Sequence, residues 1–249
     1  MSTKSIIEIR GLKKSFGTQP VLEDIDLDVH AGETLVVLGH SGTGKSVLIK
    51  HMNVLLRPDE GEVIFDGQPI HDLREKDLVP VRRRIGMLFQ NGALFDSLTI
   101  ADNVAFPLDE HEICSGKERT QRVAQLLDMV ALDGAQLKMP SELSGGMRKR
   151  AALARTLALE PEVVLYDEPT TGLDPVTAQQ INELITGLQE RLGLTSVVVT
   201  HDIASANHVA DRMAFLYDGK VLRVDTAAAM RASEDPLISA FLAGGNSTA

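Results

Sequence analysis

Several features that define other classes of protein are scarce or missing in this 249-residue sequence. A single cysteine, Cys114, rules out an internal disulfide and fits a reducing compartment. No run approaches the roughly 18–20 consecutive apolar residues that a membrane-spanning helix needs. The first ten residues, MSTKSIIEIR, lack the long apolar stretch of a signal peptide. We therefore expect a cytoplasmic protein that reaches a membrane only through another chain.

Basic charge is also in short supply. Lysine and arginine number 25 against 35 acidic residues, and this formal net charge of −10 argues against a dedicated nucleic-acid surface. Two short basic clusters do occur, at 82–84 and 148–150, and we interpret both as solvated helix faces. The hydrophobic fraction of 43% is that of an ordinary globular protein, so we expect one large α/β domain with room for an inserted subdomain.

Hydrophobic periodicity divides the chain into strands and helices. Alternation of apolar and polar residues predicts half-buried antiparallel strands at 5–10, 21–29 and 61–65. Continuous apolar runs predict strands buried on both faces, as in a parallel sheet, at 34–38, 163–166 and 196–200. Helical spacing predicts helices near 44–53, 117–131, 144–158, 176–191 and 202–209. The middle third, 91–158, has no buried-strand run, and we interpret it as a helical subdomain inserted into an α/β core.

Two further signals lie toward the C-terminus. Asp218-Gly219, between two apolar stretches, predicts a hairpin turn. The tail from Gly244, GGNSTA, is expected to be disordered.

Residues 39–46 read GHSGTGKS, which fits the pattern G-x-x-x-x-G-K-[ST] of a phosphate-binding loop. The motif follows an apolar strand and precedes a helical segment, so a glycine-rich turn with a surface lysine is disfavoured. Lys45 would supply positive charge to the β- and γ-phosphates, and the Ser46 hydroxyl would bind Mg²⁺. We expect the whole loop to contact a nucleotide: Gly39, His40, Ser41, Gly42, Thr43, Gly44, Lys45, Ser46 and Val47.

Two carboxylates follow the apolar run 163–166. Acidic residues at the end of a parallel strand lie at the carboxyl edge of the sheet, where ligands bind in open α/β folds. Asp167 would hold Mg²⁺, directly or through water. Glu168 is then placed to polarise an attacking water as general base. A strand-end turn with two solvated acids is the plainer alternative, and the phosphate loop makes it less attractive.

Residues 143–148 read LSGGMR, and Leu-Ser-Gly-Gly at a helix start between these two motifs resembles the signature of ABC ATPases. The resemblance covers nearly the whole chain. It implies a RecA-like P-loop NTPase core with an N-terminal antiparallel β subdomain and an inserted helical subdomain. The corresponding boundaries are 1–90 and 159–225 for the core, 91–158 for the helical subdomain, and 226–249 for a C-terminal tail.

The same resemblance assigns roles to residues outside the phosphate loop. Phe16 would stack on adenine, where the family usually has tyrosine. Gln90 would touch Mg²⁺ and sense the membrane partner, and His201 would contact the γ-phosphate. Asp174 closes the stretch Gly172-Leu173-Asp174, which is similar to the D-loop of the family.

The signature itself implies an assembly. Ser144, Gly145 and Gly146 at a helix N-terminus can present a hydroxyl and N–H groups to phosphate. In the family they close over the nucleotide of a second copy, so a homodimer with two equivalent sites is implied. Met147 stands where many relatives have glutamine, so the contacts just after the signature can differ. ATP and Mg²⁺ are the implied ligands.

The stretch QNGALFDSLTIADNVAFPL at 90–108 is unusually apolar and resembles the ATPase branch of Mla phospholipid-transport systems. In the family this region receives a helix from the permease. The branch implies a permease of the MlaE type, a periplasmic MCE protein of the MlaD type and a small STAS-domain protein of the MlaB type, with the ATPase on the cytoplasmic face of the inner membrane. Two alternatives stay open: an importer for another solute such as an amino acid, and an ABC ATPase outside transport.

Overall fold

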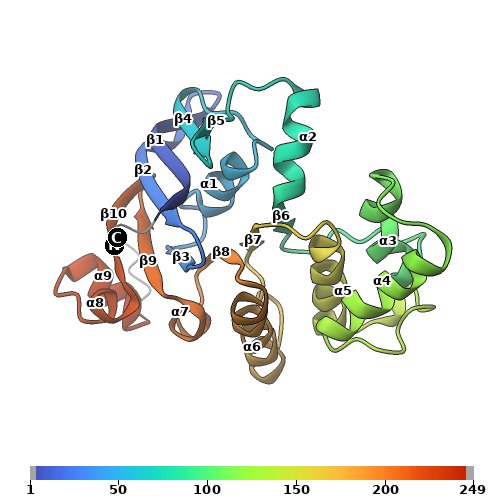
Figure 1. Ribbon diagram of the computed structural model, residues 1–249. Helices are drawn as coiled ribbons and strands as arrows, with labels where there is room; N and C mark the ends of the chain where they lie inside the picture. The colour runs from blue at the N-terminus through green and yellow to red at the C-terminus, as the bar shows by residue number, and fades with distance from the viewer. Residues whose placement is uncertain (1–3, 245–249) are drawn as a thin grey trace.

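The computed structural model describes residues 4–244. Within that range no helix is long and apolar enough to span a membrane. Two β-sheets stacked in layers and a set of flanking helices make up the fold (Figure 1).

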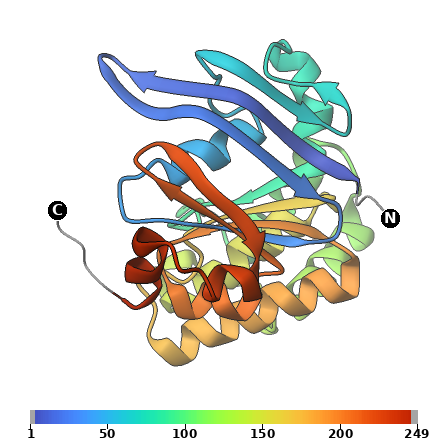
Figure 2. The same cartoon turned by 90° about the vertical axis from the view of Figure 1, so that its left-hand side faces the viewer.

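The antiparallel sheet has the strand order β2-β1-β4-β5. Its strands are β1 (Ser5–Phe16), β2 (Gln19–His30), β4 (Glu60–Phe65) and β5 (Gln68–Pro69). Buried residues recur at roughly every second position along much of β1 and β2, as the sequence pattern predicts for strands with one covered face. The two strands lie side by side in Figure 2. The three predicted antiparallel strands are thus confirmed, and β1 and β2 extend to form a long hairpin.

The larger sheet has the order β10-β9-β3-β8-β7-β6, and all its pairs are parallel except β9 with β10. Its strands are β3 (Thr34–Leu38), β6 (Ile85–Leu88), β7 (Val163–Asp167), β8 (Thr195–Thr200), β9 (Arg212–Tyr217) and β10 (Lys220–Thr226). All residues of β3, β7 and β8 are buried, which confirms the three predicted parallel strands. The Asp218-Gly219 turn joins β9 to β10 as predicted.

Helices cover both faces of the larger sheet. They are α1 (Lys45–Met52), α2 (Glu75–Arg84), α3 (Ile100–Glu110), α4 (Gly116–Met129), α5 (Gly145–Leu157), α6 (Pro175–Leu192), α7 (Ile203–Val209), α8 (Ala227–Arg231) and α9 (Pro236–Leu242), with a 3-10 turn η1 (Pro140–Glu142). One apolar core joins the two sheets around α1, and the other joins the opposite face of the larger sheet to the helices from α3 onward. Asp174 caps α6 and Pro175 opens it, as expected from their order.

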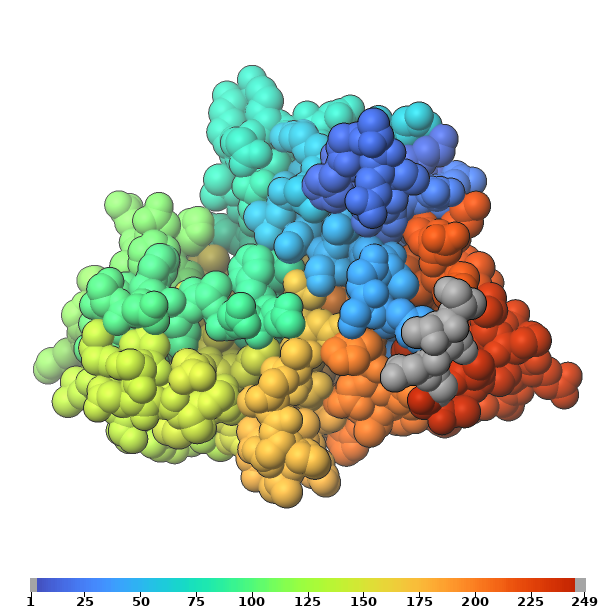
Figure 3. All heavy atoms as spheres, turned by 180° about the vertical axis from the view of Figure 1, so that it is seen from behind, coloured from blue at the N-terminus to red at the C-terminus, as the bar shows by residue number. Residues whose placement is uncertain are grey.

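The segment between β6 and β7 contains α3, α4, η1 and α5, and it gathers at one end of the molecule (Figure 3). The helical character predicted for this part of the chain is confirmed. Helices α2 and α3 were missed by periodicity because each contains a proline, Pro80 and Pro107. The tail expected to be disordered begins at Gly244, and its residues 245–249 lie outside the described range.

Candidate nucleotide-binding site

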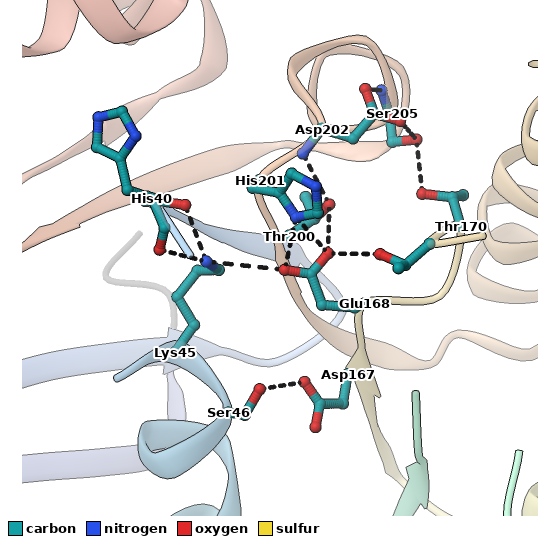
Figure 4. Close-up of polar contacts among 12 residues, drawn as sticks. His40, Lys45, Ser46, Asp167, Glu168, Thr170, Thr200, His201, Asp202 and Ser205 are labelled. Carbon is teal, nitrogen blue, oxygen red and sulfur yellow. Dashed lines mark hydrogen bonds and ion pairs between the residues drawn. The ribbon is translucent and has the colours of Figure 1, made fainter. Parts of the chain in front are cut away.

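Parallel strand order brings three chain segments to one edge of the larger sheet. β3 pairs with β8 and β8 pairs with β7, with Leu38 opposite Thr200 and Asp167 opposite Val199. The residues that follow these strand ends therefore meet at the carboxyl edge, where open α/β sheets bind ligands. The phosphate loop, the Asp167-Glu168 pair and His201 all lie there (Figure 4).

The phosphate loop needs its glycines for two physical reasons. Gly44 has φ of 98°, a left-handed conformation that other residues rarely adopt. A Cβ on Gly39 would lie 2.3 Å from the Leu216 carbonyl oxygen, too close for any side chain. The loop then opens α1, whose first N–H groups and positive end favour an anion.

The loop lines two neighbouring hollows. One cavity of 450 Å³ is bordered by the second half of the loop, by Val21 of β2 and by residues that follow β6, β7 and β8: Val21, Ser41, Gly42, Gly44, Lys45, Ser46, Val47, Gln90, Glu168, Thr171 and His201. Another of 530 Å³ includes His40 and Thr43 beside Tyr217. The structure thus places Gln90 and His201 at the border of the cavity beside the phosphate loop.

Lys45 is buried at the centre of this site. Its Nζ donates to the Gly39 and His40 carbonyl oxygens at 2.8 and 2.9 Å, and lies 3.7 Å from Glu168 Oε1. Burial lowers the pKa of Lys45, while the Glu168 and Asp167 carboxylates act to raise it. The amine is therefore hydrogen-bonded to carbonyl groups of its own loop, in a position from which it can contact a phosphate.

Ser46 and Asp167 provide oxygen ligands of the kind that Mg²⁺ prefers. The Ser46 hydroxyl donates to Asp167 Oδ1 at 2.6 Å, and Gln90 borders the same cavity. Among residues 4–244 no three His, Cys, Asp or Glu side chains are arranged to hold a metal on their own. This donor set fits Mg²⁺, which binds through one or two carboxylates and relies on substrate phosphates and water for the rest.

Glu168 is held by several side chains at once. Its carboxylate lies 2.9 and 3.0 Å from His201 Nδ1 and accepts from Thr171 Oγ1 at 3.0 Å and from Thr200 Oγ1 at 3.3 Å. Its backbone has φ of 48°, which is strained for a residue with a Cβ. Strain maintained by surrounding bonds is typical of functional positions, and the carboxylate is fixed beside the phosphate loop.

The signature residues lie apart from the phosphate loop. Ser144 caps α5 and accepts a bond from the Met147 N–H at 3.3 Å. A Cβ on Gly146 would lie 2.4 Å from Thr177 Cγ2, so α5 and α6 approach closely here. A separate cavity of 370 Å³ connects Gly145 to Gln90 and to the Gly172-Leu173 turn.

Two predicted site residues are not brought to the phosphate loop. Phe16 ends β1 with 50% of its surface exposed, and its ring lies 5.8 Å from Lys14 Nζ. Asp174 accepts from the Val176 and Thr177 N–H groups, and from the Thr177 hydroxyl at 2.6 Å. These hydrogen bonds lower the pKa of Asp174. Within this single chain the side chain of Asp174 serves as a helix cap.

Sequence reasoning missed two residues that contact Glu168 and misjudged one basic cluster. Thr171 and Thr200 bind Glu168, and hydroxyl residues beside strand ends were the available signal. The prediction that the basic cluster 148–150 is a solvated face was wrong for Lys149, which is 6% exposed. Its amine donates to the Gln90 and Glu168 carbonyl oxygens, which are distant in sequence and so invisible to a local pattern.

Comparison with known proteins agrees with this geometry. The family model described as "ABC transporter" matches residues 22–171. A Mycobacterium leprae protein, "Probable ribonucleotide transport ATP-binding protein mkl", is 43% identical over 96% of this chain and 69% of its own length. The Haemophilus influenzae "Intermembrane phospholipid transport system ATP-binding protein MlaF" is 42% identical over 97% of this chain and 91% of its own.

A solved structure shares the fold. The chain superimposes on the "Dimeric structure of a post-hydrolysis state of the ATP-binding cassette MJ0796 bound to ADP and Pi" with a TM-score of 0.82. The two are 36% identical, and the match covers 89% of this chain and 98% of the other. The expected fold, an α/β nucleotide-binding core with an antiparallel β layer and a helical insertion, is confirmed.

Proposed function

The chain belongs to the ABC transporter family as an ATP-binding, ATP-hydrolysing subunit, and from this premise we propose that it energises phospholipid transport between two membranes. The observation that carries the proposal is the match to MlaF, which extends over 97% of this chain and 91% of the relative. Because the aligned region covers nearly the full length of both sequences, little of either protein lies outside it. The apolar stretch after Gln90 supports the same branch.

A second candidate substrate has one observation in its favour. The 43% identical mycobacterial relative is named for ribonucleotide transport, but this chain spans only 69% of that relative. A cassette meets the permease and not the cargo, so similar cassettes can serve different solutes. The phospholipid proposal is preferred because the lengths agree.

In the proposed reaction the phosphate loop receives the β- and γ-phosphates. The Lys45 amine leaves the Gly39 and His40 carbonyls and binds the phosphates, and this movement also takes the amine away from Glu168. Glu168 then polarises the attacking water, and His201 holds it near the γ-phosphate. Ser46, Asp167 and Gln90 would hold Mg²⁺, which supplies charge neutralisation when bound.

The signature supports a homodimer as the working unit. Ser144, Gly145 and Gly146 border neither phosphate-loop cavity in the described part of the chain. In a head-to-tail pair each signature would cover the nucleotide of the other copy, with Asp174 and its turn at the contact between copies. ATP bound between the copies favours the closed state, and hydrolysis reverses that preference. In this arrangement the adenine stacks on Phe16.

The exposed aromatic pair Phe95 and Phe106 is the proposed contact with the permease. The rings lie 4.8 Å apart and are 42% and 40% exposed. Paired aromatic rings at a surface offer the rigid apolar anchor that partner helices use. The permease would be of the MlaE type, accompanied by MlaD-like and MlaB-like proteins, with this chain at the cytoplasmic face of the inner membrane.

A tagged chain purified from its own membranes in mild detergent tests the substrate proposal. We expect a permease, an MCE protein, a STAS-domain protein and enriched glycerophospholipid, identified by mass spectrometry of proteins and lipids. Recovery of a permease with an amino-acid or nucleotide-binding partner would contradict the phospholipid proposal. Recovery of no membrane protein would favour an ABC ATPase outside transport.

A matched pair of variants tests the docking surface. Phe95→Ala with Phe106→Ala should release the permease while ATPase activity of the isolated subunit stays within about twofold, because interface anchors carry most binding energy. Leu137→Ala is the control, since Leu137 is an apolar residue of the same subdomain that is 87% exposed. Equal permease recovery in both would refute the role of the aromatic pair.

A further inference from the structure

The segment from Gln90 to Phe95 lies between β6 and α3 and has no helix or strand of its own. Backbone carbonyls in such a segment need partners outside it, because an unpaired buried polar group costs free energy. This segment carries both Gln90, which borders the phosphate-loop cavity, and Phe95, one of the exposed aromatic pair. What holds this segment therefore affects both the phosphate-loop cavity and the exposed aromatic pair.

Lys149 holds the first residue of the segment. Its amine donates to the Gln90 carbonyl oxygen and, at 3.2 Å, to the Glu168 carbonyl oxygen. A buried amine is costly unless it is hydrogen-bonded. Burial lowers the pKa of Lys149, and the Asp167 and Glu168 carboxylates oppose that change. The side chain thus connects the signature helix α5 to the two loops that border the phosphate site.

Arg155 holds the rest of the segment from the same helix. Its guanidinium donates to the Gly92 carbonyl at 2.8 Å and to the Ala93 carbonyl at 2.7 Å. The group also lies 5.8 Å from the centre of the Phe95 ring, within range of a cation–π contact.

Between these two cations the segment touches α5 directly. A Cβ on Gly92 would lie 3.2 Å from Ala152 Cβ, so the backbone at Gly92 packs against the helix. Contacts at positions 149, 152 and 155 follow successive turns of α5. The whole segment is fastened along the helix that begins at the signature.

We propose that Lys149 and Arg155 are positioning residues which fasten segment 90–95 to α5, so that Gln90 and the signature end of the helix move as one unit. Neither residue touches the nucleotide directly in this role. The pair acts by fixing where Gln90 stands relative to α5. The neighbouring Arg150 provides a control, because its guanidinium instead bonds Gln180 Oε1 at 2.9 Å on another face of α5.

Hydrogen exchange of the nucleotide-free protein tests the fastening itself. The amides of Gly92, Phe95 and Leu98 are hydrogen-bonded and should report on it. We expect Arg155→Met and Lys149→Met each to speed exchange of these amides about tenfold, because hydrogen bonds to charged groups disfavour local opening of the segment. Arg150→Met should leave the exchange rates unchanged. Wild-type exchange in both Arg155→Met and Lys149→Met would overturn the proposal. Arg155 is only half buried, so its variant stays informative if Lys149→Met folds poorly.

A double-mutant cycle with Gln90 tests the consequence for hydrolysis. Lys149→Met should lower kcat about tenfold with KM for Mg-ATP within about threefold, since the phosphate loop still holds the nucleotide. In a Gln90→Ala background the same change should alter kcat less than about twofold. An undiminished effect in that background would overturn the proposal. A Gln90→Ala variant with normal kcat would instead refute the role proposed for Gln90, and the exchange result would still decide the fastening.

Discussion

The phosphate loop and the signature are built on the same device, a glycine-containing turn at the start of a helix, yet they differ in how complete they are. Lys45, Asp167 and Glu168 are buried and bonded to one another or to nearby groups of the chain. Ser144 is exposed and caps only its own helix. We call the phosphate-loop region, whose side chains are already bonded within the chain, the finished half-site. The signature turn is the open half-site, because its hydrogen-bond donors are offered to a molecule that this single chain does not supply. The difference supports the proposal that each site is assembled from two copies.

Replacing Glu168 should cause the largest loss of ATPase activity at the finished half-site. Glu168→Gln keeps the shape and the hydrogen bonds from Thr171 and Thr200 but cannot accept a proton from water. We expect kcat to fall about 10²- to 10⁴-fold, the usual contribution of a general base, while ATP binding persists. Steady-state ATPase assays and ATP titration measure the two effects. Normal turnover would remove Glu168 as the base.

Removing the Lys45 amine should weaken nucleotide binding. Lys45→Ala deletes charge-assisted bonds to phosphate, each worth about 1.5–3 kcal/mol, so we expect affinity for ATP to fall about 10- to 100-fold. Lys50→Ala on the same helix α1 is the matched control. Equal ATP affinity in the two variants, measured by calorimetry, would count against the phosphate-loop assignment.

The contact between α5 and α6 can be broken by a single methyl group. Gly146→Ala would place a Cβ 2.4 Å from Thr177 Cγ2, and Thr177 cannot rotate away without losing its bond to Asp174. We expect a loss of about 1–3 kcal/mol in the free energy of unfolding, typical of overpacking. Thr177→Ser removes that methyl but keeps the hydroxyl, so the double variant should recover stability in denaturant titrations. A double variant as unstable as Gly146→Ala would show that this clash is not the cause.

How much the sequence predicts also differs between the two regions. The strands β3, β7 and β8 and the phosphate loop follow from apolar runs and a local motif, because neighbouring residues determine them. The burial of Lys149 does not, since its partners Gln90 and Glu168 are 59 and 19 residues away. Helices α2 and α3 were hidden by Pro80 and Pro107, which tertiary packing tolerates. Phe16 was expected at the adenine, and its exposed position in the single chain leaves that role a prediction.

The division into a finished half-site and an open one is tested most directly by ATP-dependent dimerisation of the Glu168→Gln variant, followed by sedimentation. With Mg-ATP we expect this variant to sediment as a dimer, and the same variant carrying Ser144→Arg to remain a monomer that still binds ATP. The added arginine would obstruct the signature and leave the phosphate loop intact. A dimer that forms equally well with Ser144→Arg, or loss of ATP binding by that variant, would contradict the assembly of each site from two copies.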